Sequence, residues 1–556
     1  MREMIRADES SGGCGAQRRV PARPHRALVL AAALLVLVAC GAPLRSADAG
    51  QREHGAEDVW QREGRAAVAR ARALQQRTGP ARNVVLFIGD GMGVTTVTAA
   101  RILEGQLRGE PGEENLLAFE RLPYVALSKT YNTDEQVPDS AGTATAMLTG
   151  SKTRAGVINV DARVARGDAA GAVGHALPTL IERAEARGLH TGVVTTTRLT
   201  HATPAAAYAH SPERDWEVDS ELPKTAREAG FRDIARQLVE FSHGDGLEVA
   251  LGGGRAYFLP QHAPDPLDAQ ARGARHDGRD LIAAWRKRAA GAAVVYDRTA
   301  LLAVDPLRTG PLLGLFARSH LAYEVERTSA TTEPSLAEMT RVALEILRRA
   351  PQGFALLVEG GRIDHGHHAG SAHRALHETL AFSDAVRAAL ELVDLENTLV
   401  VVTADHSHSL TMSGYPTRGN PILGLVVEND ERGAPQPTPA RDGLGLPFTT
   451  LGYHDGPGYP GASDAQPEGA KRLPHEWKSV QGVRHGRPDL SPLDTGDPSY
   501  LQEAAIPAQS ESHGGEDVAI YAGGPGAQLF HGVQEQSYVY HAILAALGWD
   551  AEQAAK

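Results

Sequence analysis

Cysteine is nearly absent from this 556-residue sequence. The only two cysteines, Cys14 and Cys40, lie near its start. We expect Cys14 to be removed with a cleaved leader and Cys40 to carry a lipid, which excludes a disulfide. An exported chain without disulfides depends for its stability on its hydrophobic core and on any metals that it binds.

The sequence also lacks an excess of basic residues. It has 56 Lys and Arg against 68 Asp and Glu, and a net charge of −12 gives no reason to expect nucleic acid as a partner. Hydrophobic residues make up 42% and charged residues 22% of the chain, as in ordinary soluble globular proteins. The length exceeds one typical domain, but large α/β enzymes reach it as one core with inserts.

The apolar run Leu28–Ala39 has twelve residues, which is too short to span a bilayer as a stable helix. It follows a basic leader and ends in Leu37-Val38-Ala39-Cys40, which resembles a bacterial lipobox. We therefore predict a lipoprotein signal peptide at 1–39, a lipid anchor on Cys40 and a polar tether at 40–58. The alternative is an ordinary secretory signal cleaved nearby. Either way we expect an exported protein that faces the periplasm or the cell surface.

Trp60 to Gln76 shows the apolar spacing of an amphipathic helix, which Thr78-Gly79-Pro80 breaks. We assign 59–82 to this N-terminal helical region, and place the start of the main body at residue 83.

The stretch 358–368, V-E-G-G-R-I-D-H-G-H-H, follows a predicted buried strand at Phe354–Val358. Asp364 and His368 are four residues apart, so a helical turn places both on one face, whereas Glu359 points elsewhere. One tetrahedral metal cannot use so many donors, which indicates more than one metal. The alternative is a solvated His-rich loop that binds metal only adventitiously.

Other predicted strands also end in metal-type ligands. Val84–Ile88 runs into Gly89-Asp90-Gly91-Met92-Gly93, whose spacing is not that of a dinucleotide-binding loop, so Asp90 is better placed to bind a metal. His201 and Thr203 follow a strand at 191–196, and Asp405 and His406 follow one at 398–403; His513 precedes one at 518–521. His201 alone would more often be a hydrogen-bonded core histidine. The convergence of so many ligands at strand ends predicts a metal site at the carboxyl edge of an α/β sheet.

Ser140 lies in P-D-S-A-G-T-A-T-A-M (138–147), where small residues begin a helix. The simple interpretation is that Ser140 is the N-cap. A serine at a helix N-terminus also suits an incoming phosphate, and a metal bound to its hydroxyl would make it a nucleophile. No G-x-S-x-G surrounds it, so a Ser-His-Asp triad is not expected.

Six motifs, in order, resemble the alkaline phosphatase family. They are D-G-M-G (90–93), D-S-A-G-T-A-T (139–145), H-A-T-P (201–204), V-E-G-G-R-I-D-H-G-H-H (358–368), T-A-D-H-S-H (403–408) and H-G-G-E-D-V (513–518). L-G-G-G-R (251–255) and H-G-V-Q-E-Q (531–536) are similar to its animal-type branch, and the resemblance covers about residues 57–550. It implies a three-layer α/β/α sandwich around a large, mostly parallel sheet. The core would comprise 83–411 and 510–556, with a crown-like insert at 412–509.

The resemblance also implies a set of site residues, two Zn²⁺ and one Mg²⁺ per chain. One zinc would be held by Asp364, His368 and His513, the second by Asp90, Asp405 and His406 with Ser140 close by, and the magnesium by Asp90, Thr203 and Glu359. Arg214 matches the arginine that clamps the substrate, because its planar fork can bind two phosphate oxygens. His201 and His365 are expected to tune the third metal and its bound water rather than to bind it directly.

The implied reaction is hydrolysis of small phosphate monoesters through a phosphoserine at Ser140, carried out by a homodimer. A phosphodiesterase typically uses Thr as nucleophile and lacks the arginine clamp, and a sulfatase needs a residue converted to formylglycine. A non-catalytic metal-binding lipoprotein would need neither Ser140 nor Arg214. The positions that align best with the calcium ligands of the animal enzymes are Leu267, Ala317 and Glu333, so we expect no equivalent calcium site.

Overall fold

The computed structural model describes residues 58–443, 445–460, 472–474 and 488–550. The predicted signal peptide, the lipid anchor at Cys40 and almost all of the tether lie outside these residues. Within them, no helix combines the length and the apolar character needed to cross a membrane.

The described chain falls into two compact units, divided between residues 73 and 74. The described part of the first is the helix α1 (Val59–Ala73), all of whose residues are solvent-accessible and none of which is buried. The predicted helix is present, and it ends at Ala73, three residues before the predicted Gln76.

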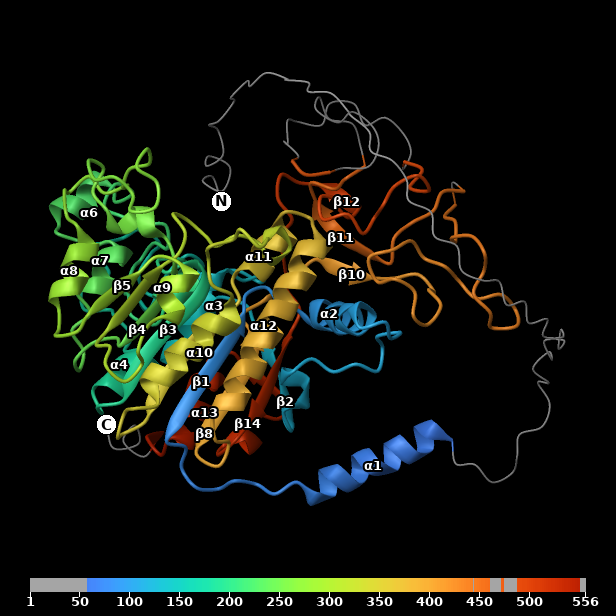
Figure 1. Ribbon diagram of the computed structural model, residues 1–556, viewed down its shortest axis with the longest axis horizontal. Helices are drawn as coiled ribbons and strands as arrows, with labels where there is room; N and C mark the ends of the chain where they lie inside the picture. Colours follow the sequence, from blue (N-terminus) through green and yellow to red (C-terminus); the bar gives the residue numbers. More distant parts are fainter. Residues whose placement is uncertain (1–57, 444, 461–471, 475–487, 551–556) are drawn as a thin grey trace, which may run out of the picture. The chain divides into compact units, whose positions relative to one another are not determined.

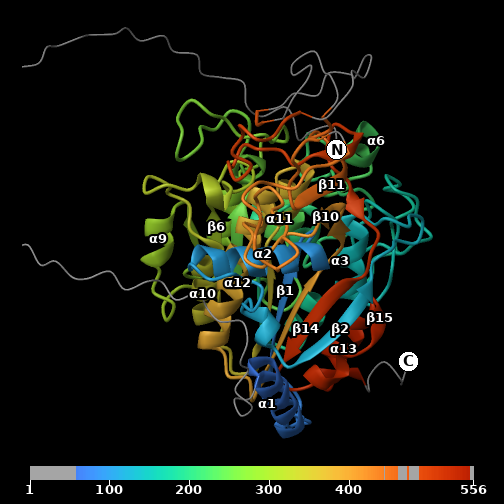
Figure 2. The same cartoon turned by 90° about the vertical axis from the view of Figure 1, so that its right-hand side faces the viewer.

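The second unit is built on a ten-stranded sheet in the order β15-β2-β14-β8-β1-β7-β3-β4-β6-β5. The strands are β1 (Asn83–Gly89), β2 (Tyr124–Lys129), β3 (His190–Arg198), β4 (Val249–Gly253), β5 (Ala293–Val295), β6 (Leu312–Leu315), β7 (Phe354–Glu359), β8 (Thr398–Ala404), β14 (Val518–Gly523) and β15 (Val533–Glu535). β14 runs antiparallel to both of its neighbours, and the other pairings in this sheet are parallel. In Figure 2, β2, β14 and β15 form one edge of the sheet, with α13 (Tyr538–Ala546) beside them.

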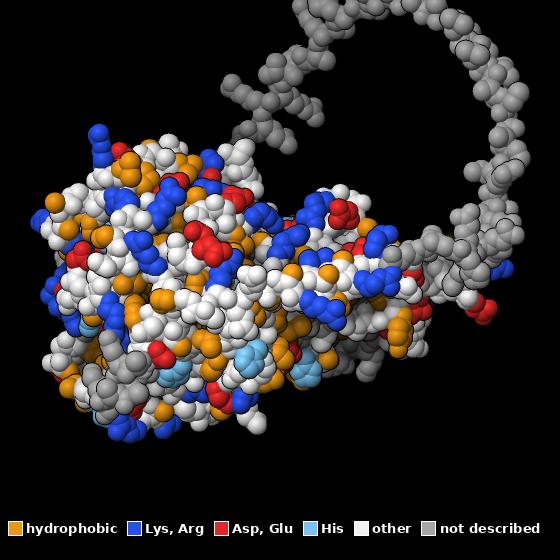
Figure 3. Space-filling view, turned by 90° about the horizontal axis from the view of Figure 1, so that it is seen from below, with side chains coloured by type: hydrophobic (Ala, Val, Ile, Leu, Met, Phe, Trp, Pro, Cys, Tyr) orange, Lys and Arg blue, Asp and Glu red, His pale blue; other side chains and the backbone are white. Residues whose placement is uncertain are grey.

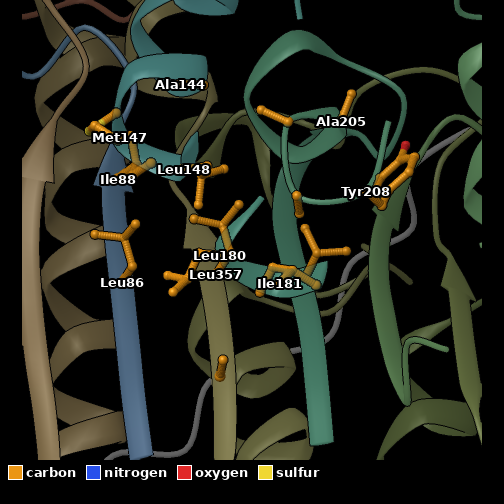
Figure 4. Close-up of a cluster of buried hydrophobic side chains, with 14 of the residues drawn as sticks. Leu86, Ile88, Ala144, Met147, Leu148, Leu180, Ile181, Ala205, Tyr208 and Leu357 are labelled. Atoms are coloured by element: carbon orange, nitrogen blue, oxygen red, sulfur yellow. The ribbon is translucent and has the colours of Figure 1, made fainter. Parts of the chain in front are cut away.

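Strand β1 shows why the sheet lies between two helical layers. Its apolar run is buried on both faces, as expected for a central parallel strand. Leu86 and Ile88 belong to a core that includes helices α3 (Ser140–Thr149), α4 (Leu180–Glu185) and α13 (Figure 4). Phe87 faces the opposite core, against α2 (Val94–Leu107), α10 (Leu336–Leu347) and α12 (Ala372–Leu392). Figure 1 shows α10 and α12 crossing in front of the strands. The predicted three-layer α/β/α sandwich is confirmed.

Helix α11 (Arg362–His368) begins three residues after the end of β7. It confirms the predicted helical turn that carries Asp364 and His368.

Part of the predicted insert at 412–509 is described. β11 (Leu451–Gly456) pairs with β10 (Leu410–Met412) and β12 (Ala504–Pro507) in a small separate sheet. Tyr453 of β11 is buried, and its hydroxyl lies 2.8 Å from Nδ1 of His367 in α11. This sheet therefore packs directly against the helix that carries the predicted metal ligands, while 461–471 and 475–487 lie outside the described residues.

Candidate active site

Ser140 is the first residue of α3, and it is buried. The interpretation of Ser140 as the N-cap is wrong, because Asp139 caps the helix by accepting a hydrogen bond of 3.1 Å from the Gly142 N–H. With that backbone donor already satisfied by Asp139, the Ser140 hydroxyl remains available. Its Oγ lies 3.1 Å from Nε2 of His406 and 3.5 Å from Oδ1 of Asp90.

A first group of ligands surrounds Asp364 on α11. Its Oδ1 lies 2.8 Å from Nε2 of His408 and 3.3 Å from the Nε2 atoms of both His368 and His513. The last two nitrogens are themselves 3.1 Å apart. Burial lowers the pKa of His368, so its ring is neutral and presents a lone pair to its neighbours. Nitrogen atoms that converge on one carboxylate in this way are suited to holding a metal ion.

A second group lies at the ends of β1 and β8, where Asp90, Asp405 and His406 are fully buried. Nε2 of His406 is 3.3 Å from Oδ2 of Asp405 and 3.4 Å from Oδ1 of Asp90. Burial and the nearby Asp405 raise the pKa of Asp90 well above its ordinary value. Two carboxylates this deep in the protein require a compensating positive charge.

A third group joins Asp90 to Glu359, the last residue of β7, and to His201, which precedes the short helix α5 (Ala202–Ala205). Burial raises the pKa of Glu359 to about 7. Four buried atoms here have no hydrogen-bond partner among the described residues: Asp90 Oδ2, Glu359 Oε1, Thr203 Oγ1 and His201 Nδ1. Buried polar atoms are rarely left unpaired because the cost is high, so these atoms fit a bound cation. His201, expected only to tune this metal, lies close enough to offer a ligand atom of its own.

Arg214 is held in place beside Ser140 by Asp139. Its Nη1 donates to Oδ2 of Asp139 at 2.6 Å, and Nη2 lies 3.2 Å from Nε2 of His201. Burial alone would raise the pKa of Asp139, but the Arg214 charge and the N–H groups of Gly156 and Gly142 hold it below its ordinary value. Asp139 therefore links the start of α3 to a fixed guanidinium.

The structure adds residues to which the sequence analysis gave no role. His408 lies between Asp364 and Glu511, whose Oε2 is 2.5 Å from His408 Nδ1, and only its place in T-A-D-H-S-H could have pointed to it. His320 lies 4.4 Å from His365 and 5.5 Å from His201, measured between ring centroids. No sequence signal marks His320, because only the fold brings it there. His365, the other residue expected to tune the third metal, lies 5.5 Å from His201 by the same measure.

A sequence profile described as "Alkaline phosphatase" matches residues 81–549. The chain belongs to the alkaline phosphatase family. It is 46% identical over 496 residues to the tissue-nonspecific alkaline phosphatase of Gallus gallus, covering 88% of this chain and 89% of the relative. It is also 46% identical over 474 residues to an alkaline phosphatase of Gadus morhua, covering 84% and 91% of the two chains.

Solved structures agree with the fold. The alkaline phosphatase of Thermus thermophilus superimposes with a TM-score of 0.58 at 26% identity, covering 85% of this chain and 93% of the other. This alkaline phosphatase is therefore an α/β enzyme that hydrolyses phosphate monoesters, and its clustered carboxylates and imidazoles form a site for divalent metals.

Proposed function

We propose that this alkaline phosphatase acts through a phosphoserine formed on Ser140, with two Zn²⁺ and one Mg²⁺ bound beside it. The observation that carries the proposal is the position of the Ser140 hydroxyl. It lies at the N-terminus of α3, next to His406 and Asp90, while Asp139 satisfies the helix cap. The N–H groups and the positive dipole end of a helix favour an incoming phosphate.

Three ligand sets would hold the metals. The proposed sets are Asp364, His368 and His513 for one zinc, Asp90, Asp405 and His406 for the other, and Asp90, Thr203 and Glu359 for magnesium. Three metal-type groups of the described residues contain all of these side chains except Thr203, and the buried Oγ1 of Thr203 has no hydrogen-bond partner among the described residues; both observations support this assignment. When bound, the metals supply positive charge that lowers the pKa of the serine hydroxyl and stabilises the attacking and leaving oxygens.

The chain's own residues would carry the substrate through two displacements. Arg214, fixed by Asp139, binds two phosphate oxygens and orients the phosphoryl group. Ser140 Oγ, having lost its proton, attacks phosphorus as the bond to the leaving alcohol breaks. Water then attacks the phosphoserine, which releases inorganic phosphate and restores the serine. Two inversions retain the configuration at phosphorus.

Several wider features are proposed from the sequence. A lipid on Cys40, after removal of 1–39, would anchor the enzyme to a membrane with the catalytic body in the periplasm or at the cell surface. The polar tether at 40–58 would separate the anchor from the body. A homodimer with the insert at 412–509 near its interface is proposed from the family resemblance.

The test compares wild type with Ser140→Ala, both loaded with zinc and magnesium, on p-nitrophenyl phosphate. We expect the variant to lose at least about 1,000-fold in kcat, because the nucleophile acts with its partners as a unit. Ser151→Ala, which lies just beyond the end of α3, serves as the matched control and should remain active.

Two further substrates complete the experiment. Faster hydrolysis of bis-p-nitrophenyl phosphate or p-nitrophenyl sulfate would assign a diesterase or a sulfatase instead. If the protein bound stoichiometric metal but hydrolysed none of the three substrates, it would be a non-catalytic metal-binding lipoprotein. Full activity of Ser140→Ala would contradict the phosphoserine.

A further inference from the structure

Three carboxylates meet far from the catalytic residues, at the edge of the sheet where the parallel strands begin. Glu185 is the last residue of α4, Asp245 lies in the loop before β4, and Glu248 directly precedes that strand. One oxygen from each lies within 4.8 Å of one from each of the others. The proposed catalytic ligands lie at the opposite edge, where the parallel strands end, so this group is separate from them.

Two members of the group are almost completely buried. Glu185 is 2% and Glu248 is 7% exposed, while Asp245 is exposed and opens the group to solvent. The Thr191 hydroxyl donates to Glu185 Oε1, and its N–H donates to Glu248 Oε2 at 2.6 Å. Glu185 Oε2 is buried and makes no hydrogen bond of ordinary geometry with the described residues, although the Gly246 N–H lies near this carboxylate. An unpaired carboxylate oxygen in this position indicates that something else binds it.

The loop before β4 lies directly against Glu185. Gly244 has a φ of +57°, and a Cβ added there would lie 2.4 Å from Glu185 Oε2 and 2.8 Å from its carbonyl oxygen. Gly246 has a φ of +82°. Glycine at these positions therefore lets the backbone approach the buried carboxylate and bring Asp245 beside it.

The positive charge of Arg288 acts on all three carboxylates but forms no ion pair with them within 4.0 Å among the described residues. Nη2 of Arg288 donates instead to the backbone carbonyl of Asp245 at 3.1 Å. Burial lowers the pKa of His190, which keeps that ring neutral. The face of the molecule drawn in Figure 3 carries Lys, Arg, Asp and Glu side chains interspersed, with no large patch of one sign. What distinguishes the group is therefore the burial of two of its three carboxylates.

We propose that Glu185, Asp245 and Glu248 form a calcium site distinct from the catalytic metals. All three side chains offer hard oxygen ligands, and the group contains no imidazole or thiolate, which disfavours zinc. Calcium accepts several carboxylates in irregular geometry, whereas Mg²⁺ demands near-octahedral geometry and keeps most of its water. A bound calcium would tie α4, the glycine loop and β4 together, independently of the chemistry at Ser140.

Protons and calcium should compete for the carboxylates of Glu185 and Glu248. Without a cation, burial raises the pKa of Glu185 to about 7 and that of Glu248 to about 8. The charge of Arg288 opposes this effect at Glu185, and the charge of Asp245 reinforces it at both glutamates. Calcium should therefore bind more tightly as the pH rises through this range.

The test uses the zinc- and magnesium-loaded enzyme. Equilibrium dialysis with ⁴⁵Ca²⁺ should show one more calcium per chain in wild type than in Asp245→Asn or Glu248→Gln. Calcium should also raise the Tm of wild type and not that of the two variants. Asp305→Asn, which alters another exposed loop aspartate that caps its own turn, is the matched control and should bind calcium like wild type.

Hydrolysis of p-nitrophenyl phosphate is followed in parallel. It should be unchanged in Asp245→Asn, so that a difference in calcium binding cannot come from the catalytic metals. Equal calcium binding and an equal rise in Tm in wild type and both variants would overturn the site. An equal rise in Tm with magnesium at the same concentration would overturn its assignment to calcium.

Discussion

Two of the three ligand groups near Ser140 form a nitrogen-rich half and an oxygen-rich half of the site, and Asp405 and His406 of the remaining group belong to neither. The nitrogen-rich half places three imidazoles around the single carboxylate of Asp364: His368, His408 and His513. The oxygen-rich half is formed by Asp90, Glu359 and Thr203, with one imidazole from His201. Imidazole suits zinc, and carboxylate and hydroxyl oxygens suit magnesium, so the donor atoms alone favour different ions in the two halves.

The halves also differ in access to solvent. The side chains of His368 and His513 are 14% exposed, whereas Asp90 and Glu359 are fully buried. Solvent therefore reaches two imidazoles of the nitrogen-rich half, whereas in the oxygen-rich half it reaches His201 but not the carboxylates of Asp90 and Glu359. We infer that the first half takes part in the displacement directly and that the second supports it electrostatically.

The largest effect is expected from the nitrogen-rich half. His368→Gln should lower kcat by more than about 100-fold, because loss of a direct ligand should exceed the 10- to 100-fold effect of outer-shell partners. Metal analysis should show about one zinc fewer per chain. His373→Gln on the neighbouring α12 is the control and should keep both zinc and activity. Retention of full zinc content by His368→Gln would contradict the assignment.

A smaller effect is expected from the oxygen-rich half. Glu359→Gln should lose magnesium and about 10- to 100-fold in kcat while keeping its zinc, because the amide is a weaker ligand for a hard cation. Adding excess magnesium should restore part of the activity. Parallel loss of zinc and magnesium in this variant would show that the two halves are not separate.

Arg214→Lys should change substrate binding more than the chemical step. A lysine keeps the positive charge but cannot bind two phosphate oxygens with one planar fork, so KM should rise by about tenfold. The fall in kcat should be smaller than the rise in KM when initial rates are measured over a range of p-nitrophenyl phosphate concentrations. An unchanged KM would show that Arg214 does not bind the phosphoryl group.

Glu185, Asp245 and Glu248, at the other edge of the sheet, form a third kind of group, in which all the ligand atoms are oxygens. Because the pKa of Glu248 rises to about 8 in the folded state, the folded chain binds more protons than the unfolded chain between its ordinary pKa and about pH 8. Stability should therefore fall as pH rises through this window, by up to about 1.4 kcal/mol per pH unit for each such group.

Glu248→Gln removes this titration. Urea unfolding of the zinc- and magnesium-loaded enzyme without calcium, from about pH 5 to 9, should show a shallower decline in the variant than in wild type. Glu431→Gln, at an exposed position, should keep the wild-type slope. Identical slopes for Glu248→Gln and wild type would mean that Glu248 is ionised throughout.

Most of the fold followed from local patterns. Val84–Ile88, Phe354–Val358 and Thr398–Thr403 are apolar runs that can be buried only as central strands, and they form β1, β7 and β8. The start of α10 at Leu336 is also encoded locally, because Ser335 and Glu338 form a capping box there. Such signals are short-range, so the sequence alone is enough to place them.

The sequence by itself also indicated the types of ligand and the serine that we propose as the nucleophile, because residue chemistry and spacing are written in the motifs. Only the tertiary structure decided which ligands meet. His513 precedes β14 in the sequence, whereas the other ligands follow their strands. It still lies in the site because β14 runs antiparallel and therefore begins at the edge where the parallel strands end. Glu185 and Glu248 belong to no motif; they meet because Thr191, at the start of β3, hydrogen-bonds to both. Contacts between residues far apart in the chain depend on strand order and direction, which no local pattern specifies.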